Sequence, residues 1–339
     1  MTTRLCRTFQ TAPAAVPRDD SAKYLRSGIT AEGFSAPDWL VPDLEDGTAP
    51  EMKSEALENI QELLPERAPD FPGEIWPRVE WSYDSEAIRE RGIDQIETLA
   101  ETVGDHINGV VVPKVGRLED VQAAESAVAA AARAADADIE FAVIIESARA
   151  RSDLREIALS GRESLLTALV FGPVDYTAEL GGREIGQRPT WSGLHEALSN
   201  EASANDLLAI GGPFDRLFRE RAGVTFYNGD GYADHVEREA QVGLDGSWSL
   251  HPNQTAQANR IHLPTADELR TAVKKIEAFV EAKDTGTGAV AIDGQMVDEA
   301  TLKNFENTVE TVRTVHDAHE EQTKERYEGV LLDRTLALE

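Results

Sequence analysis

Residues 140–147, EFAVIIES, decide the fold class of this chain. Five consecutive apolar residues, 141–145, stand between two glutamates, and such a short run is typical of a strand buried on both faces. The runs GVVV (109–112) and LLTALVFG (165–172) repeat this pattern, and the Ala-rich amphipathic stretch 117–136 separates the first run from EFAVIIES. Short apolar runs that alternate with longer amphipathic ones predict a parallel sheet with helical crossovers.

The same alternation extends outward over about residues 7–262. Strands are expected at 7–11, 39–43, 75–81, 109–115, 139–147, 165–172, 207–211 and 247–250. Helices are expected between them at 21–28, 52–64, 93–103, 117–136, 194–204 and 232–242, with Pro65 ending the second. This order predicts an α/β protein with a (β/α)8 TIM barrel.

Polar or glycine residues follow seven of these strands at steps of 29–39 residues, about one strand–helix unit each. Since functional groups of a barrel lie at the carboxyl ends of its strands, these residues are expected around one mouth. They are Asp46, Arg78, Lys114, Glu146, Asp175, Gly212 and His251. An open doubly wound sheet is the alternative, but it needs a Gly-rich phosphate turn after its first strand, which RTFQTAPAAV (7–16) lacks.

The last quarter of the chain has a different pattern. We expect a catalytic barrel over residues 1–262 and a C-terminal helical extension over 263–339. A helix is predicted at 265–286, a short extended segment with a turn at 286–300 and a long helix at 299–326. The extension is expected to fold over a barrel mouth, either that of its own chain or that of a neighbouring subunit.

Composition excludes several classes of protein. With 62 acidic and 33 basic residues the net charge is −29, which opposes binding to nucleic acid. The one cysteine, Cys6, excludes an intramolecular disulfide framework and a cysteine-based zinc site. No apolar run suits a membrane span or a signal peptide, so a cytoplasmic protein is expected. The acid excess and the small number of lysines, eight, favour a high-salt cytoplasm over an ordinary acidic enzyme.

Two acids are the strongest candidates for a metal site. Glu146 closes the apolar strand, and Asp175 follows the next strand one unit later. A carboxylate at the end of a buried strand is costly unless it is paired or bound to a cation, and two of them with water and substrate oxygens suit Mg²⁺. The alternative is that each acid pairs with an arginine, such as Arg149 or Arg183.

Two basic residues in expected strands have a similar ambiguity. Arg78 lies within IWPRVEW (75–81), where a buried guanidinium either binds a carboxylate or oxyanion of a substrate or pairs with an acid of DLED (43–46). Lys114 in VVVPKVG (110–116) either contributes to the site or forms a salt bridge to DLED. His251, before a proline, is expected to be a hydrogen-bonded strand-end residue rather than a base.

These strings in this order resemble the citrate lyase β-subunit-like family, and within it the malyl-CoA lyases. The matching strings are VPDLEDGTAP (41–50), PRVEW (77–81), VVVPKVG (110–116), FAVIIESARA (141–150), FGPVDYTAELG (171–181), GSWSLHPNQTAQAN (246–259) and GQMVDEATLK (294–303). The resemblance implies a (β/α)8 barrel in trimers or hexamers, with a C-terminal segment that covers a neighbour. It also implies reversible, Mg²⁺-dependent Claisen cleavage of a 3-hydroxyacyl-CoA to an acyl-CoA and a 2-oxo acid such as glyoxylate.

The resemblance also assigns roles to residues. It implies that Glu146 and Asp175 hold Mg²⁺, with Mn²⁺ as a substitute, and that Arg78 binds substrate oxygens. Asp298 stands in the position of the family's lid aspartate and is implied to be the general acid/base. Asp46 stands where related 2-oxo-acid aldolases carry a catalytic histidine, which argues against that aldolase chemistry.

The chain departs from the family pattern at the barrel mouth. FQTAPAAV (9–16) replaces an FVPG-like first strand, Gly211 replaces an Asp common before the GPF turn, and RERAGVTFYN (219–228) is additional. Arg18, Lys23 and Arg26 are candidates for CoA phosphate contacts, or they form a solvated helix face. Lys114 and Asp46 complete the candidate substrate contacts. Malate synthase, citramalyl-CoA lyase and, less favoured, a non-catalytic subunit are the alternative functions.

The acid excess predicts salt-dependent stability. Raising KCl from about 0.1 M to about 1 M shortens the Debye length from ~10 Å to ~3 Å and screens repulsion among the carboxylates. The Tm of the purified protein, followed by circular dichroism, should therefore rise over this range. A Tm that stays level would instead indicate an ordinary acidic enzyme.

Overall fold

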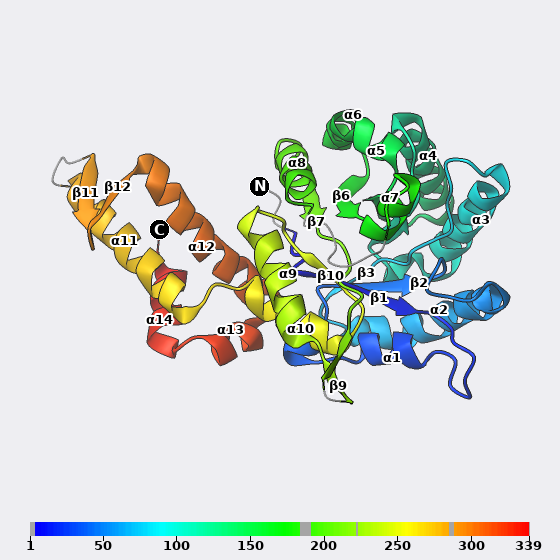
Figure 1. Ribbon diagram of the computed structural model, residues 1–339, viewed down its shortest axis with the longest axis horizontal. Coiled ribbons are helices and arrows are strands. Elements are labelled where there is room, and N and C mark those ends of the chain that lie inside the picture. Colours follow the sequence, from blue (N-terminus) through cyan, green and yellow to red (C-terminus); the bar gives the residue numbers. More distant parts are fainter. Residues whose placement is uncertain (1–3, 184–190, 222, 285–287, 339) are drawn as a thin grey trace. The chain divides into compact units, whose positions relative to one another are not determined.

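The protein is described by a computed structural model that covers residues 4–183, 191–221, 223–284 and 288–338 (Figure 1). The chain divides into two compact units, of which the first ends at Asn259 and the second begins at Arg260. The first unit has parallel strands with surrounding helices, and the second has helices and a small hairpin.

Eight parallel strands of the described residues form the centre of the first unit. They are β1 (Thr8–Pro13), β2 (Trp39–Asp43), β3 (Glu74–Ile75), β4 (Gly109–Val112), β5 (Glu140–Ile145), β6 (Leu166–Phe171), β7 (Leu208–Ile210) and β10 (Ser247–Ser249). They pair in two runs, β10-β1-β2-β3 and β4-β5-β6-β7. A parallel bridge from Arg78 to Val111 joins the first run to the second, and a bridge from Ile210 to Gly246 leads back to β10. The strands therefore close into the predicted (β/α)8 barrel.

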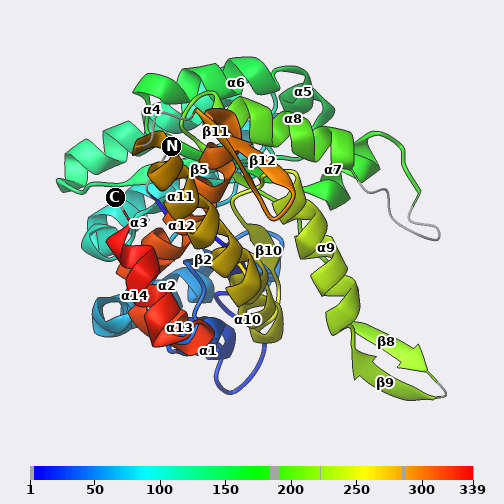
Figure 2. The ribbon, with the colours of Figure 1, turned by 90° about the vertical axis from the view of Figure 1, so that its left-hand side faces the viewer.

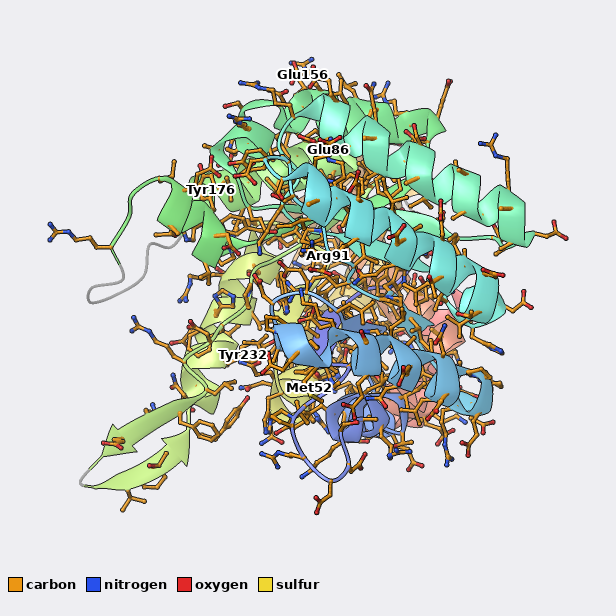
Figure 3. The ribbon with its side chains drawn as sticks, turned by 90° about the vertical axis from the view of Figure 1, so that its right-hand side faces the viewer. Met52, Glu86, Arg91, Glu156, Tyr176 and Tyr232 are labelled. Atoms are coloured by element: carbon orange, nitrogen blue, oxygen red, sulfur yellow. The ribbon has the colours of Figure 1, made fainter. Side chains whose placement is uncertain are left out.

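Helices alternate with these strands and pack around them (Figure 1). They are α1 (Lys23–Ile29), α2 (Lys53–Arg67), α3 (Glu86–Val103), α4 (Leu118–Ala135), α5 (Ala148–Ser152), α6 (Leu154–Ser160), α7 (Pro173–Glu179), α8 (Ser192–Ser203), α9 (Gly229–Gln241) and α10 (Pro252–Ile261). Their outer faces carry acids such as Glu86 and Glu156, which point into solvent (Figure 3).

Several element boundaries differ from the sequence prediction, such as that of α3, which begins at Glu86 and not at 93, and a proline explains two of them. Helix α2 continues through Pro65 to Arg67, because a proline in the last turn removes the partner of only one carbonyl. Strand β3 ends at Ile75 instead of extending to Trp81, since Pro77 has no N–H for a continuous ladder. The chain still follows the barrel there, because the N–H of Arg78 donates to the carbonyl of Pro42 at 2.8 Å.

The core has two layers, as the two faces of a barrel strand require. In β2, Trp39 and Val41 face the barrel interior, whereas Leu40 faces the helices. Inside the barrel, the rings of Trp39 and Trp76 stack with centroids 4.1 Å apart. The interior is thus filled by side chains, which leaves the mouth as the place for polar chemistry.

The additional stretch that the sequence placed at 219–228 folds mainly as an antiparallel ribbon. Strand β8 (Phe218–Arg221) pairs with β9 (Val224–Tyr227) between β7 and α9. The ribbon extends away from the end of α9 (Figure 2). Phe218, Val224 and Phe226 are exposed on it.

The second unit contains α11 (Ala266–Asp284), the hairpin β11 (Ala289–Ile292) and β12 (Gln295–Asp298), α12 (Glu299–Ala318), α13 (Glu320–Arg326) and α14 (Gly329–Ala337). Phe279, Ile292 and Val297 form a small core of their own. The single helix predicted over 299–326 is wrong, because His319 leaves the helical conformation and Glu320 and Glu321 begin a new first turn. Residues 285 and 286, the predicted end of α11, lie outside the described residues. None of the described helices is long and apolar enough to cross a bilayer.

Candidate active site

Glu146 lies directly after β5, at the carboxyl end of the barrel. Its side chain is only 5% exposed, and its Oε1 accepts the backbone N–H of Lys114 at 2.7 Å. The backbone of Gly172, after β6, passes so close that a Cβ there would lie 2.3 Å from Oε2. Glycine is therefore required at 172 to let the two strand ends enclose the carboxylate.

The environment of Glu146 disfavours its charged form. Burial raises the pKa of this carboxyl to about 8, and the nearby Asp175 carboxylate adds to the shift. The N–H of Lys114 and the guanidinium of Arg78 act in the opposite direction. The net result of these opposing effects is a raised pKa, so this carboxyl ionises readily only when a further cation is present.

Asp175 lies in the first turn of α7, the helix that follows β6, and it is half-buried. The structure therefore brings together the two acids that the sequence singled out. Arg149, one of the expected alternative partners, instead lies over the ring of Tyr83 at 4.8 Å. Within the described residues, neither Arg149 nor Arg183 forms an ion pair with Glu146 or Asp175.

This pair of acids fits a hard divalent cation. The described residues contain no group of three or more His, Cys, Asp or Glu side chains arranged to hold a metal. Mg²⁺, however, keeps several waters and commonly binds through one or two carboxylates and substrate oxygens. A buried carboxylate with a raised pKa beside a second, half-buried one is such a donor set.

Arg78 is held by two acids of the DLED segment. Its Nε donates to Oδ1 of Asp43 at 2.7 Å and its Nη2 to Oδ2 at 2.5 Å, while Nη1 lies 3.3 Å from a carboxylate oxygen of Glu45. Although burial disfavours its charge, Asp43 and Glu45 raise the pKa of Arg78. Two of its five N–H groups remain for a substrate.

Lys114 is held by the same segment. Its Nζ donates to Glu45 and, at 2.7 Å, to Asp46. These carboxylates raise the pKa of Lys114 against the effect of burial, and burial raises the pKa of Glu45. For Asp46, burial acts to raise the pKa, but the hydrogen bond and the charge of Lys114 outweigh burial and the pKa is lowered. The salt bridges to DLED that the sequence analysis considered are thus present for both cations.

The remaining candidates lie elsewhere. Asp298 is in the second unit, where it is the exposed N-cap of α12 and its Oδ1 accepts from the backbone N of Thr301 at 2.8 Å. Hydrogen bonds from Thr301 lower its pKa. Arg18, Lys23 and Arg26 are exposed in or just before α1, and Arg26 is 3.5 Å from Asp20. The His251 Nδ1 accepts the N–H of Asn253, which agrees with its expected structural role.

Sequence reasoning missed a buried acid on α9. Glu239 of α9 is fully buried and pairs with His235 at 3.0 Å beside the loop after β7. A signal was present, because Glu239 falls on the buried stripe of α9 that also contains Tyr232 and Val236.

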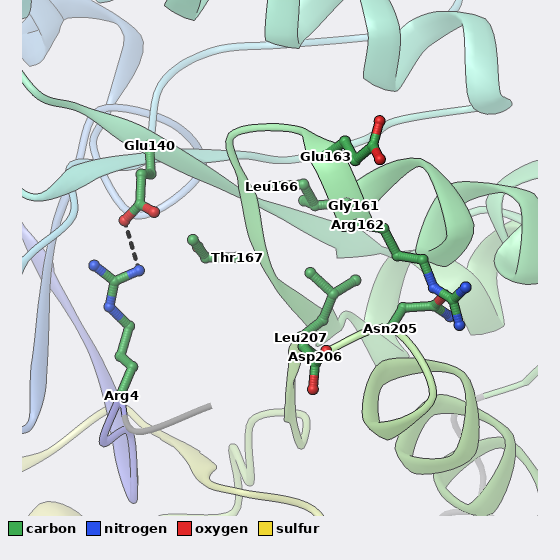
Figure 4. A pocket seen from close by; sticks show the side chains of 10 residues that line it. All are labelled: Arg4, Glu140, Gly161, Arg162, Glu163, Leu166, Thr167, Asn205, Asp206 and Leu207. Carbon is green, nitrogen blue, oxygen red and sulfur yellow. Dashed lines mark ion pairs between the residues drawn. The ribbon is translucent and has the colours of Figure 1, made fainter. Parts of the chain in front are cut away.

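Two cavities accompany the barrel. One, of about 610 Å³, lies at the amino ends of β5 and β6, where Arg4 ion-pairs with Glu140 at 2.5 Å (Figure 4). The other, of about 350 Å³, is lined by residues that include Phe171, His195 and Gly212. Barrel chemistry takes place at the carboxyl ends of the strands, so the first cavity is not the candidate site.

Comparison with known proteins identifies the family of the chain. The family model of HpcH/HpaI aldolase/citrate lyase matches residues 27–252. The chain belongs to this family. Membership in the HpcH/HpaI aldolase/citrate lyase family confirms the resemblance drawn from the strings around Glu146 and Asp175, and it makes the chain a carbon–carbon lyase.

Known relatives are similar to this chain over different shares of their own length. An L-malyl-CoA/β-methylmalyl-CoA lyase of Haloarcula marismortui is 62% identical, covering 99% of each chain. A malate synthase of Haloferax volcanii is 34% identical over 88% of this chain and 70% of its own length. A solved structure, the magnesium/glyoxylate complex of Haloferax volcanii malate synthase, has a TM-score of 0.71 and 29% identity over 99% of each chain.

The raised pKa of Glu146 predicts that Mg²⁺ binding depends on pH. Below about pH 8 the metal-free carboxyl carries a proton that a cation must displace, so affinity should fall as pH decreases from 9 to 6. Calorimetric titration with MgCl₂ in buffers of different ionisation enthalpy should show proton release at pH 7 and less at pH 9. An affinity that does not change with pH would contradict the assignment of Glu146.

Proposed function

We propose that this protein is a Mg²⁺-dependent lyase that reversibly cleaves β-methylmalyl-CoA and malyl-CoA to propionyl-CoA or acetyl-CoA and glyoxylate. The observation that carries the proposal is the Glu146–Asp175 pair beside the anchored Arg78, at the mouth of a barrel whose whole chain is 62% identical to a lyase named for these substrates. The metal, the oxygen of the enolate and the proton at the acyl α-carbon each have a candidate residue in the chain.

Glu146 and Asp175 would hold the metal. Their carboxylates supply two negative oxygen ligands, and Lys114 fixes Glu146 through its backbone N–H. When bound, Mg²⁺ supplies Lewis-acid polarisation of the 2-oxo acid's carbonyl oxygen. The apolar strand behind Glu146 keeps bulk water away from the carboxylate and strengthens its attraction for a cation.

Arg78 is the group that would stabilise negative charge on the substrate. Breaking the carbon–carbon bond leaves an enolate of the acyl thioester, and its oxygen needs a positive donor that is already in place. Asp43 and Glu45 fix the guanidinium and leave two N–H groups for that oxygen or for the carboxylate of glyoxylate. The fixed geometry means that little reorganisation is needed when charge develops.

Asp298 would transfer the proton at the acyl α-carbon. It protonates the enolate carbon in cleavage and removes that proton in condensation. In its own unit the carboxyl is exposed and its pKa is lowered by Thr301, so it is a weak base there. Burial of Asp298 against a barrel mouth, as a lid contributed by a neighbouring subunit, would remove water and raise the pKa. This role implies a homo-oligomer, a homotrimer or homohexamer, with residues 263–339 as the lid.

The CoA part of the substrate is negatively charged, and the protein is acidic, so binding needs local positive charge. Arg18, Lys23 and Arg26 form a local basic group around α1 that would contact its phosphates. Lys114 and Asp46 border the site and would contact the substrate nearer the reacting carbons. The acid excess suits work in a cytoplasm of high salt.

The function is tested by a product assay. Purified enzyme with Mg²⁺ in molar KCl should convert glyoxylate with propionyl-CoA or acetyl-CoA to the hydroxyacyl-CoA, and it should cleave that product in reverse. The similarity to malate synthase supports a rival activity that also hydrolyses the thioester. Free CoA released in step with malate would identify that rival, and no product from either acyl-CoA would contradict the proposal.

The control for this assay changes one acid at each end of β5. Glu146→Ala should abolish Mg²⁺-dependent turnover without loss of the fold, whereas Glu140→Ala, at the other end of the same strand, should keep it. Full activity in Glu146→Ala would remove the metal assignment.

Asp298 is tested by isotope exchange. Asp298→Asn should suppress deuterium exchange at the α-carbon of the acyl-CoA at least tenfold, because the amide cannot take up the proton, while acyl-CoA binding is retained. Asparagine is an equally good N-cap, so α12 should remain folded. The matched control is Asp293→Asn in the turn of the same hairpin. Wild-type exchange in Asp298→Asn would require another base.

A further inference from the structure

Glu239 is a buried acid that no step of the proposed reaction uses. Its side chain is fully buried on α9, and its Oε1 lies 3.0 Å from Nε2 of His235, one turn earlier. His195 of α8 and Ser247 of β10 also face it. A buried carboxylate is costly even when paired, so its position calls for a physical account.

The pair holds both backbone polar groups of Gly212, its N–H and its carbonyl oxygen. Oε1 of Glu239 accepts the backbone N–H of Gly212 at 3.1 Å. Nε2 of His235 lies 3.0 Å from the carbonyl oxygen of Gly212 as well as 3.0 Å from the carboxylate. Because both of these are acceptors, Nε2 carries the hydrogen. The loop after β7 is thereby fixed at its second residue.

The fit leaves no space for a side chain at Gly211 or Gly212. A Cβ on Gly211 would lie 2.0 Å from Oε1 of Glu239 and 2.1 Å from the carboxyl carbon. A Cβ on Gly212 would lie 2.5 Å from Cδ of Pro173 and 3.0 Å from the carbonyl oxygen of Phe171. The Glu239 carboxylate thus fills the volume beside Gly211, and Gly212 presses directly on Pro173.

Pro173 connects this contact to the candidate metal site. It is the first residue of α7, and Asp175 lies in the same first turn. Gly172, just before it, packs against the carboxylate of Glu146. The short turn between β6 and α7 is therefore confined between Glu146 on one side and the held Gly212 on the other.

We propose that Glu239 and His235 form a positioning pair that sets the place of Asp175 relative to Glu146. The pair acts through Gly212 and Pro173 and touches neither substrate nor metal. This inference rests on the proposed function. It adds that the proposed metal site depends on the Glu239–His235 pair, which contacts the loop after β7 and not the metal site itself.

The electrostatics agree with this geometry. Burial disfavours both charges, but the Glu239 carboxylate raises the pKa of His235, and His235 in turn lowers the pKa of Glu239. These opposite shifts favour the ionic form of the pair, in which charge-assisted hydrogen bonds hold Gly212 more firmly than neutral ones would.

The test measures Mg²⁺ affinity by calorimetry, without acyl-CoA, in the full-length protein. Glu239→Ala should weaken Mg²⁺ binding by about 10- to 100-fold, the range for partners that orient a metal's ligands. Glu239→Gln keeps an acceptor for Gly212 but loses the charge, so a smaller loss is expected. Glu237→Ala, an exposed acid of the same helix, should bind as the wild type does. Amide exchange of the peptide containing Gly212 should become faster in both Glu239 variants.

A double-variant cycle tests the steric part. Gly211→Ala should weaken Mg²⁺ binding in the wild-type background, because the new methyl group displaces the carboxylate. In the Glu239→Ala background that space is empty, so Gly211→Ala should add little further loss. Additive losses would contradict the proposed packing.

Outcomes separate this inference from the function on which it rests. Unchanged Mg²⁺ affinity in Glu146→Ala would contradict the metal site itself. Loss of binding in Glu146→Ala with wild-type affinity in the Glu239 variants would overturn only the positioning role. If Glu239→Ala does not fold, the Mg²⁺ affinity and amide exchange of Glu239→Gln decide, and wild-type values of both would overturn the proposal.

Discussion

A carboxylate at the end of an apolar barrel strand is the constraint on which the rest of the structure depends. Glu146 extends from β5, whose side chains are almost all buried, so its charge has little contact with water. Burial alone would neutralise it, and its pKa of about 8 reflects that cost. The backbone N–H of Lys114 and the field of Arg78 reduce the cost without removing it, which leaves the acid able to bind a cation.

The cations near this acid are held where they cannot neutralise it. Arg78 is bound by Asp43 and Glu45, and Lys114 by Glu45 and Asp46, so the DLED segment holds both side chains. A side chain that is already hydrogen-bonded does not need to reorganise when charge develops on a substrate. The same contacts keep Arg78 from closing on Glu146 as a simple ion pair. In the described part of the chain, the acids of the DLED segment therefore keep both side chains out of direct ion pairs with Glu146.

The barrel and the second unit contribute different parts of the proposed chemistry. The barrel supplies buried charges with fixed partners, whereas Asp298 is exposed and its pKa is lowered by Thr301. An exposed carboxylate with a lowered pKa is a weak base, and it does not readily remove a proton from carbon. For the proposed role its environment would have to change during the cycle, and the exclusion of water on closure is the physical means by which its pKa would rise.

The sequence by itself determined the barrel and most of the mouth. Alternation of short apolar and amphipathic runs predicted the strands, and the regular spacing of polar residues after them predicted that Glu146, Asp175, Arg78 and Lys114 converge. This works because parallel strands place successive carboxyl ends on one side. Only the tertiary structure decided which partners these residues have. It placed Asp43 and Glu45 on Arg78, and it put the Glu239 carboxylate in the space beside Gly211. Such contacts join residues far apart in the chain, and their choice depends on distances of a few tenths of an ångström that no local pattern encodes.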